Sequence, residues 1–146
     1  MGSSASLNPD PPSQEFVADP ELASEVEKLS EPCAPRVEGI LFRQGQQPDA
    51  VYLVKSGEVV LAMESDRKMI VCVRAGPGSL LGLPAAVGNR PYSLTAVLCG
   101  GAEVWEIAAT EFISLIAKKP ALSIRVLQLL AAEIRLARRA YFELIA

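Results

Sequence analysis

The sequence predicts a mainly β fold with flanking helices, in which a β sandwich, jelly roll or barrel precedes a long C-terminal helix. Short apolar runs separated by turn residues fill residues 39–107, a pattern typical of β strands. Residues 121–146 instead repeat apolar side chains every three or four positions, which is the period of a helix. A chain of 146 residues has the length of one domain with a hydrophobic core.

The composition is that of a globular protein and excludes several kinds of site. Half of the residues are hydrophobic, 21% are charged, and the net charge is −3. The sequence has no histidine, which excludes histidine-based triads and His-ligated haem. We therefore expect no enzyme activity and no metal. The mildly acidic balance also argues against direct nucleic-acid binding by this chain.

The cysteines and the lack of targeting signals favour a cytoplasmic location. The number of cysteines is odd, and no two of them form a Cys-x-x-Cys pair, which favours a reducing compartment. They are Cys33, Cys72 and Cys99. Residues 1–13 have neither the basic nor the apolar region of a signal peptide. Residues 75–102 are poor in charge but rich in proline and glycine, so we expect no membrane span.

The N-terminal part divides into a tail and a short helix. Residues 1–18 are rich in Ser and Pro, which predicts a flexible tail, and residues 19–146 are expected to form the domain. Asp19 followed by Pro20 is typical of a helix N-cap and first turn. The apolar stripe of this helix would consist of Leu22, Val26 and Leu29.

The β region contains seven candidate strands. Two of the connections between them, Ser56-Gly57 and Ser65-Asp66, are expected to be hairpin turns. The expected strands are 40–43, 51–55, 58–63, 68–74, 80–81, 94–98 and 104–107.

Two helices are expected after the strands, the first capped by Thr110 and the second opened by Pro120. The second helix carries two apolar rows. Because two rows need two surfaces, we expect one row to cover the β core and the other to form a homodimer. The alternative is a helix that packs only on its own domain. The dimer row is Leu127, Leu130, Ile134, Ala137, Tyr141 and Leu144, with heptad spacing, and the core row is Val126, Leu129 and Leu136.

The start of the β region resembles the opening of cyclic-nucleotide-binding domains. That family reads aliphatic-Phe-x-x-Gly, then aliphatic-Tyr-aliphatic-aliphatic-x-x-Gly-x-aliphatic. Residues 40–45 and 51–59 match this pattern, with Gly45 and Gly57 at the turn glycines. The likeness extends over about residues 38–140 and is to a CRP/FNR-like sensor domain, of the catabolite-activator branch whose long C-terminal helix is the dimer helix. It implies a double-stranded β-helix (jelly-roll, cupin-like) barrel over about 38–108 and C-terminal helices over about 110–146, the last a dimerisation helix.

The resemblance also implies a ligand site, the phosphate-binding cassette, from which the chain departs. In the family, a Gly-Glu pair opens a short helix and an Arg follows about ten residues later. The Glu binds the ribose hydroxyl and the Arg binds the cyclic phosphate. Here Gly82 is kept, but Leu83 replaces the Glu and Tyr92 replaces the Arg. Arg90 is either a substitute for that Arg or a solvated loop cation. The implied ligand-binding residues are Leu80, Gly82, Leu83, Arg90, Tyr92 and Ser93.

Several functional hypotheses follow. The first is a non-enzymatic sensor or regulatory domain, in which a cyclic nucleotide or another small molecule re-orients the dimer helix although the usual cAMP and cGMP contacts are lost. The second is a ligand-free dimerisation or interaction module. A third is the sensor part of a CRP/FNR-type transcription regulator, truncated before its helix-turn-helix, since the chain ends at Ala146. A cupin-type enzyme is disfavoured because it needs metal-binding histidines.

Overall fold

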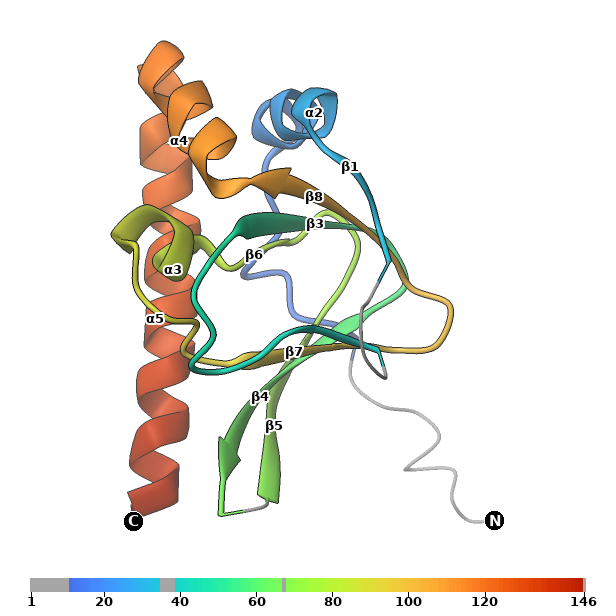
Figure 1. The fold of residues 1–146 in the computed structure, drawn as a ribbon, viewed down its shortest axis with the longest axis vertical. Helices are drawn as coiled ribbons and strands as arrows, with labels where there is room; N and C mark the ends of the chain where they lie inside the picture. Colours follow the sequence, from blue (N-terminus) through green and yellow to red (C-terminus); the bar gives the residue numbers. More distant parts are fainter. Residues whose placement is uncertain (1–10, 35–38, 67, 146) are drawn as a thin grey trace.

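The computed structural model describes residues 11–34, 39–66 and 68–145, and for residues 144 and 145 the backbone only. Two antiparallel sheets enclose the core, and the long helix α5 runs along one side of them (Figure 1). The helices are α2 (Pro20–Leu29), α3 (Leu83–Gly88), α4 (Ala109–Lys118) and α5 (Ser123–Ile145), with the 3₁₀ turn η1 (Pro120–Leu122) before α5. The predicted fold class, mainly β with flanking helices and a long C-terminal helix, is confirmed.

The sheets have four strands each. One has the order β1-β8-β3-β6 and the other the order β2-β7-β4-β5. The seven expected strands are all present, with ends shifted by a residue or two. The strands are β1 (Glu31–Cys33), β2 (Ile40–Phe42), β3 (Ala50–Ser56), β4 (Val59–Ser65), β5 (Lys68–Ala75), β6 (Leu80–Leu81), β7 (Thr95–Leu98) and β8 (Glu103–Ala108).

Strand β3 is apolar along most of its length because both of its faces are covered. Tyr52 and Val54 point into the core between the sheets, whereas Val51 and Leu53 belong to a second apolar cluster beneath the helices. Successive side chains of a strand point to opposite faces, so such a strand reads as a continuous apolar run. Strand β3 therefore joins the two halves of the core.

One of the two expected hairpins is wrong. Ser65 and Asp66 do join β4 to β5, which pair with each other. Ser56 and Gly57 instead lead from one sheet to the other, because β3 and β4 belong to different sheets. Gly57 has a φ of +77°, as the expected turn requires, although the strands on its two sides do not pair. A glycine that supplies positive φ therefore marks a tight turn without showing which strands pair.

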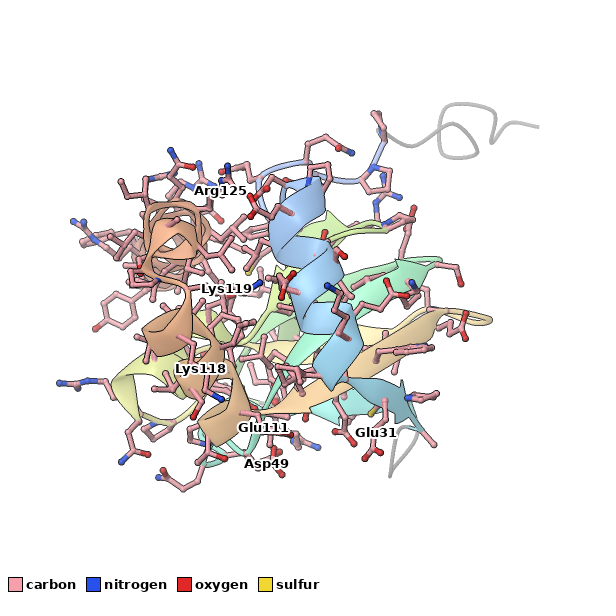
Figure 2. All side chains as sticks on the ribbon, turned by 90° about the horizontal axis from the view of Figure 1, so that it is seen from above. Glu31, Asp49, Glu111, Lys118, Lys119 and Arg125 are labelled. Atoms are coloured by element: carbon pink, nitrogen blue, oxygen red, sulfur yellow. The ribbon has the colours of Figure 1, made fainter. Side chains whose placement is uncertain are left out.

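The N-terminal helix forms where it was predicted, but of its expected apolar stripe only Leu22 and Val26 are buried, and Leu29 is 43% exposed. The carboxylate of Asp19 accepts hydrogen bonds from the amides of Glu21 and Leu22, at 3.1 and 3.5 Å. Arg125 of α5 forms ion pairs with both Asp19 and Glu21, at 3.1 and 2.6 Å. Lys119 pairs with Glu25 at 3.0 Å, so two cations hold α2 beside the start of α5 (Figure 2).

The segment before this helix differs from the flexible tail that the composition suggests. Phe16 is 1% exposed and lies in the core between the sheets. The amide of Ser13 donates to the carbonyl of Arg74 at 2.8 Å, and the carbonyl of Phe16 accepts from Leu80 at 2.9 Å. One aromatic side chain and these backbone bonds fix residues 11–18, while residues 1–10 lie outside the described part.

Two further local features differ from the expectations. Strand β1, which contains Pro32, is not among the seven expected strands and is the edge strand that pairs with β8. An edge strand tolerates a proline because one side of its backbone needs no partner. Helix α4 begins at Ala109 with Ala108 at the cap, so Thr110 does not cap it.

The core row of α5 is buried as expected. Val126, Leu129 and Leu136 lie against the barrel and the neighbouring helices. Within the described residues, no helix is long and apolar enough to cross a lipid bilayer.

Candidate ligand pocket beside the long helix

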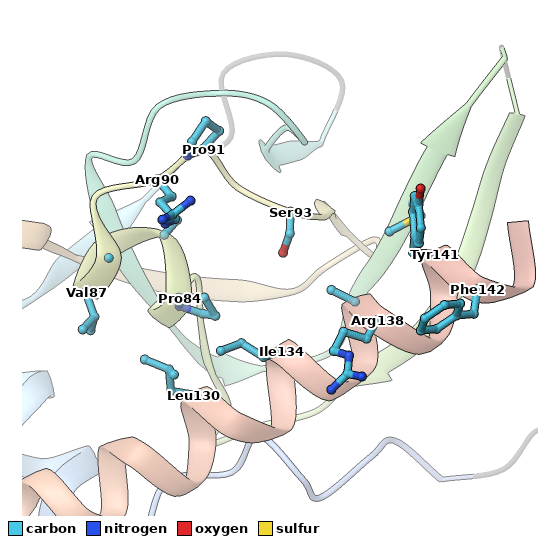
Figure 3. A pocket seen from close by; sticks show the side chains of 14 residues that line it. Pro84, Val87, Arg90, Pro91, Ser93, Leu130, Ile134, Arg138, Tyr141 and Phe142 are labelled. Atoms are coloured by element: carbon cyan, nitrogen blue, oxygen red, sulfur yellow. The ribbon is translucent and has the colours of Figure 1, made fainter. Parts of the chain in front are cut away.

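A cavity of about 650 Å³ lies between α3, the loop after it and one face of α5 (Figure 3). Its walls are mainly apolar. Helix α3 and the loop contribute Pro84, Ala85, Val87, Gly88, Arg90, Pro91 and Ser93, β4 contributes Met63, and α5 contributes Leu130, Ile134, Ala137, Arg138, Tyr141 and Phe142. Cavities of this size are typical of small-molecule sites.

The ligand-binding residues expected from the sequence fall into two groups. Arg90 and Ser93 line the cavity. The other four, Leu80, Gly82, Leu83 and Tyr92, do not line it, because all four are buried. Leu83 lies in the cluster beneath the helices, so its side chain is packed against other apolar groups. The structure thus brings Arg90 and Ser93 together with α5, rather than with the other four.

The backbone amides at the start of α3 already donate hydrogen bonds to a side chain of α5. The amide of Gly82 donates a hydrogen bond to the Oε1 atom of Glu133 at 3.2 Å, and the amide of Leu83 also bonds to this carboxyl group. Glu133 is 4% exposed. Its burial raises the pKa of the carboxyl group from the ordinary value of 4.5 to about 7, although the two amides act in the opposite direction.

Sequence reasoning missed Glu133, although the sequence contains a signal for it. The residue lies four positions after Leu129 and three before Leu136, within the row that α5 buries. An acid in the middle of a buried row is unusual, because burying an ionisable group costs free energy unless it has hydrogen-bond partners. That position alone predicts a specific polar partner, and the partner is the start of α3.

Tyr92 fills the space below the start of α3. Its hydroxyl donates to the carbonyl of Ala50 at 2.9 Å, and its ring stacks on Phe42 with 4.0 Å between ring centroids. Gly82 has a φ of +88°, and a Cβ atom at this position would lie 3.1 Å from the Tyr92 ring. Burial raises the pKa of Tyr92 to about 12. At the family's Arg position, this chain therefore has a neutral, packed aromatic side chain.

The expected dimer row of α5 faces outward. Leu127 is 60% exposed, and Ile134 and Tyr141 are also exposed, while Leu130 and Ala137 are half-buried. The side chain of Leu144 lies outside the described part. Leu130, Ile134, Ala137 and Tyr141 also line the cavity. The same apolar surface therefore belongs to the cavity and to the face that the sequence assigns to a partner.

The charged side chains at the cavity are both cations. Arg90 and Arg138 line it, and no acidic side chain does. Within the part of the chain that the structure describes, neither arginine forms an ion pair. In the same part, no three His, Cys, Asp or Glu side chains come together as metal ligands would.

Comparisons with known proteins identify the fold. The family model of the cyclic nucleotide-binding domain matches residues 38–119. The catabolite activator protein of Thermus thermophilus superposes with a TM-score of 0.70 at 24% identity, over 86% of this chain and 60% of that protein. The c-di-GMP-responsive global regulator CLP of Xanthomonas campestris gives a TM-score of 0.68 at 17% identity, over 86% and 62%.

A third structure, the regulatory domain of Toxoplasma gondii PKA with cAMP, gives a TM-score of 0.57 at 24% identity, over 66% of this chain and 37% of that one. At these identities the likeness shows the fold alone. The chain spans at most about 60% of the length of these three proteins. No curated protein sequence matches it.

Proposed function

Because the chain belongs to the family of cyclic nucleotide-binding domains, we propose that it is a non-enzymatic sensor domain. A small molecule bound between α3 and α5 changes the position of α5, and α5 joins two copies of the chain. One observation carries this proposal: Leu130, Ile134, Ala137 and Tyr141 line the cavity and also belong to the exposed apolar row of α5. A ligand that prefers one position of α5 therefore shifts the dimer toward that arrangement.

The effector is not held by the usual contacts to cAMP or cGMP. Three packed side chains support this part of the proposal. Glu133 accepts hydrogen bonds from the amides at the start of α3. The side chain of Leu83 is packed in the core, where it reaches no ribose. Tyr92 stands in place of the phosphate-binding Arg and bonds to Ala50. A ribose hydroxyl facing an apolar side chain loses its partner, which costs about 1–3 kcal/mol.

A second candidate function is a dimerisation module without a ligand. The observation that favours it is the same Glu133, because the start of α3 is completed by the protein itself. For either function, the coverage of about 60% of two bacterial regulators favours a sensor part within a longer regulator. The odd number of cysteines, with no Cys-x-x-Cys pair, supports a reducing, cytoplasmic compartment.

The dimer is tested by changing one exposed leucine of the row. We expect the wild-type chain to sediment as a dimer and Leu127→Glu as a monomer, because a buried, unpaired charge opposes association. The matched control is Ile124→Glu, which is on the same helix and 68% exposed but outside the row, and which should remain dimeric. Sedimentation velocity distinguishes the three proteins. A monomeric wild type, or equal effects of both substitutions, contradicts dimerisation through this row.

Ligand binding is tested by thermal shift with cAMP and cGMP. A ligand at 100 times its dissociation constant adds about 2.7 kcal/mol and raises the melting temperature by several degrees. We expect no shift with either nucleotide up to millimolar concentration. A clear shift that disappears in Arg90→Ala would show that the nucleotide is bound in a different way, through that arginine.

A further inference from the structure

On the premise of the proposed function, we propose that the cavity binds an amphipathic monoanion, a small molecule with an apolar body and one carboxylate-like headgroup held by Arg90. This specifies the chemistry of the effector and the residue that selects it. Three features of the cavity support it: the apolar lining, the position of its two arginines, and the Glu133 carboxyl group that accepts from the amides at the start of α3.

The cavity wall selects an apolar body. Pro84 and Val87 of α3 face Leu130 and Ile134 of α5 across the cavity (Figure 3). Apolar ligand surface that is buried against such walls is removed from water, which favours binding. A volume of about 650 Å³ holds a molecule of ten or more heavy atoms. A ligand of this size without a large apolar part would leave these walls facing water.

The cations of the cavity select a negative charge. Arg90 and Arg138 contribute two positive charges, and no acidic side chain lines the cavity to neutralise them. The guanidinium group offers paired N–H donors that match the two oxygens of a carboxylate.

Arg90 is better placed than Arg138 to hold the headgroup. Its amide donates to the carbonyl of Ala85 at 3.1 Å, which fixes the loop at the end of α3. The aliphatic part of its side chain lies close to Gly88, and Ser93 of the same loop supplies a hydroxyl at the cavity. Both arginines are exposed in the single chain, but Arg138 lies on α5 beside Ile134 and Tyr141, in the row that the proposed partner covers.

The start of α3 does not receive the headgroup. The carboxyl group of Glu133 already accepts from the amides of Gly82 and Leu83. A second anion at these two donors would have to displace the Glu133 carboxyl group, because both N–H groups already have an acceptor. The headgroup therefore lies at the opposite end of α3, where Arg90 is.

The test compares two probes that differ only in the headgroup. The full chain is saturated with the uncharged dye N-phenyl-1-naphthylamine, and the dye is displaced with decanoate or with decan-1-ol at neutral pH. We expect decanoate to displace the dye at a concentration about tenfold lower than decan-1-ol. In Arg90→Gln this preference should disappear through weaker decanoate binding, with the affinity for decan-1-ol unchanged. Arg139→Gln is the matched control, since Arg139 is outside the cavity.

Two other variants separate failure of this inference from failure of the proposed function. Val87→Glu places a charge in the apolar wall and should weaken both probes, whereas Val71→Glu, at an exposed apolar position elsewhere, should not. Circular dichroism checks that each variant is folded. If the dye binds neither the wild type nor Leu127→Glu, the ligand cavity and the proposed sensor function are both wrong.

The remaining outcomes concern the headgroup or the occupant. The assignment to Arg90 is overturned if the dye binds but decanoate is not preferred over decan-1-ol. It is also overturned if Arg138→Gln abolishes the preference and Arg90→Gln does not. Either result leaves the cavity intact. Dye binding by the Leu127→Glu monomer but not by the wild type would show that a second copy of α5 fills the cavity, which overturns the ligand class altogether.

Discussion

A single buried carboxyl group links the two walls of the cavity. Glu133 belongs to α5, and its hydrogen-bond donors belong to the start of α3. Its pKa of about 7 results from burial, and no charged side chain contributes to it. Since α3 and α5 form opposite walls, the bond from Glu133 connects the part of the protein that would meet a ligand with the part that would meet a second copy.

The pKa of Glu133 predicts how stability depends on pH. An acid whose pKa is raised by folding holds its proton more tightly in the folded state. Its contribution is therefore complete below the unfolded value of 4.5 and is lost as the pH rises through about 7. Across this interval, the wild type should lose about 3 kcal/mol of unfolding free energy relative to Glu133→Gln. Urea unfolding at a series of pH values measures the difference.

The control for this prediction lies on the same helix. Glu143 is exposed, so Glu143→Gln should follow the wild type at every pH. If Glu133→Gln also runs parallel to the wild type, the carboxyl group of Glu133 titrates normally and is not buried in solution.

The loss of the usual ligand contacts stays a prediction from residue identity, and residue identity does not show what Leu83 and Tyr92 contact in the fold. Leu83 and Tyr92 stand where the family has charged side chains, which is visible in the sequence. That Tyr92 bonds to Ala50 and packs against Gly82 depends on segments 42 and 10 positions away along the chain. Such contacts require the fold, because neither partner shows a local pattern that points to the other.

At the scale of single elements, the positions of the turns were predicted well, but the segments that surround or follow them were predicted less well. Gly45 and Gly57, the two glycines of the family motif, both have positive φ, at +89° and +77°. Their surroundings differ. A Cβ atom at Gly57 would lie 2.7 Å from the Cα atom of Ala102, whereas a Cβ atom at Gly45 would meet nothing within 4 Å. Positive φ is a local requirement, but the close approach at Gly57 is a tertiary one.

This difference predicts unequal costs for the same substitution. Gly45→Ala should lose about 1–2 kcal/mol, the cost of placing an L side chain in the left-handed region. Gly57→Ala should lose clearly more, because the backbone near Ala102 must also move. Urea unfolding of both variants provides the comparison. Equal losses would show that the backbone at Gly57 can move away from Ala102 without cost, and that the close approach there is unimportant.

Helix α5 shows what a periodic pattern can establish. Its two apolar rows predicted two covered surfaces, and the structure buries one row, which includes Leu129 and Leu136, against the rest of the domain. The other row, which includes Leu127, stays exposed in the single chain. Periodicity identifies the faces of a helix, whereas the identity of the second partner remains the proposal made above.

At the scale of the whole molecule, two apolar clusters share the same elements. One lies between the sheets and the other beneath the helices. Strand β3 contributes to both, and so does α5, with Leu136 in the first and Leu129 in the second. Residues 11–18 also join both, through Phe16 and Ala18. The clusters therefore cannot separate without unfolding the elements they share.

This arrangement predicts one cooperative transition. Trp105, the single tryptophan, reports on β8 by its fluorescence, and the far-ultraviolet circular dichroism signal reports mainly on the helices. Both signals should change at the same urea concentration, with the same slope. Loss of the helical signal before the fluorescence change would show that α5 and its neighbours unfold separately from the barrel.

The sequence by itself determined the fold class, the strands other than β1, the N-cap at Asp19 and the two faces of α5. These features depend on local periods, turn residues and caps, all of which lie within a few residues of each other. Only the tertiary structure decided that Phe16 is core, that Ser56-Gly57 crosses between sheets, and that Glu133 reaches the start of α3. Each of these joins segments far apart in the chain, and side-chain burial and hydrogen bonding, not local preference, select such contacts.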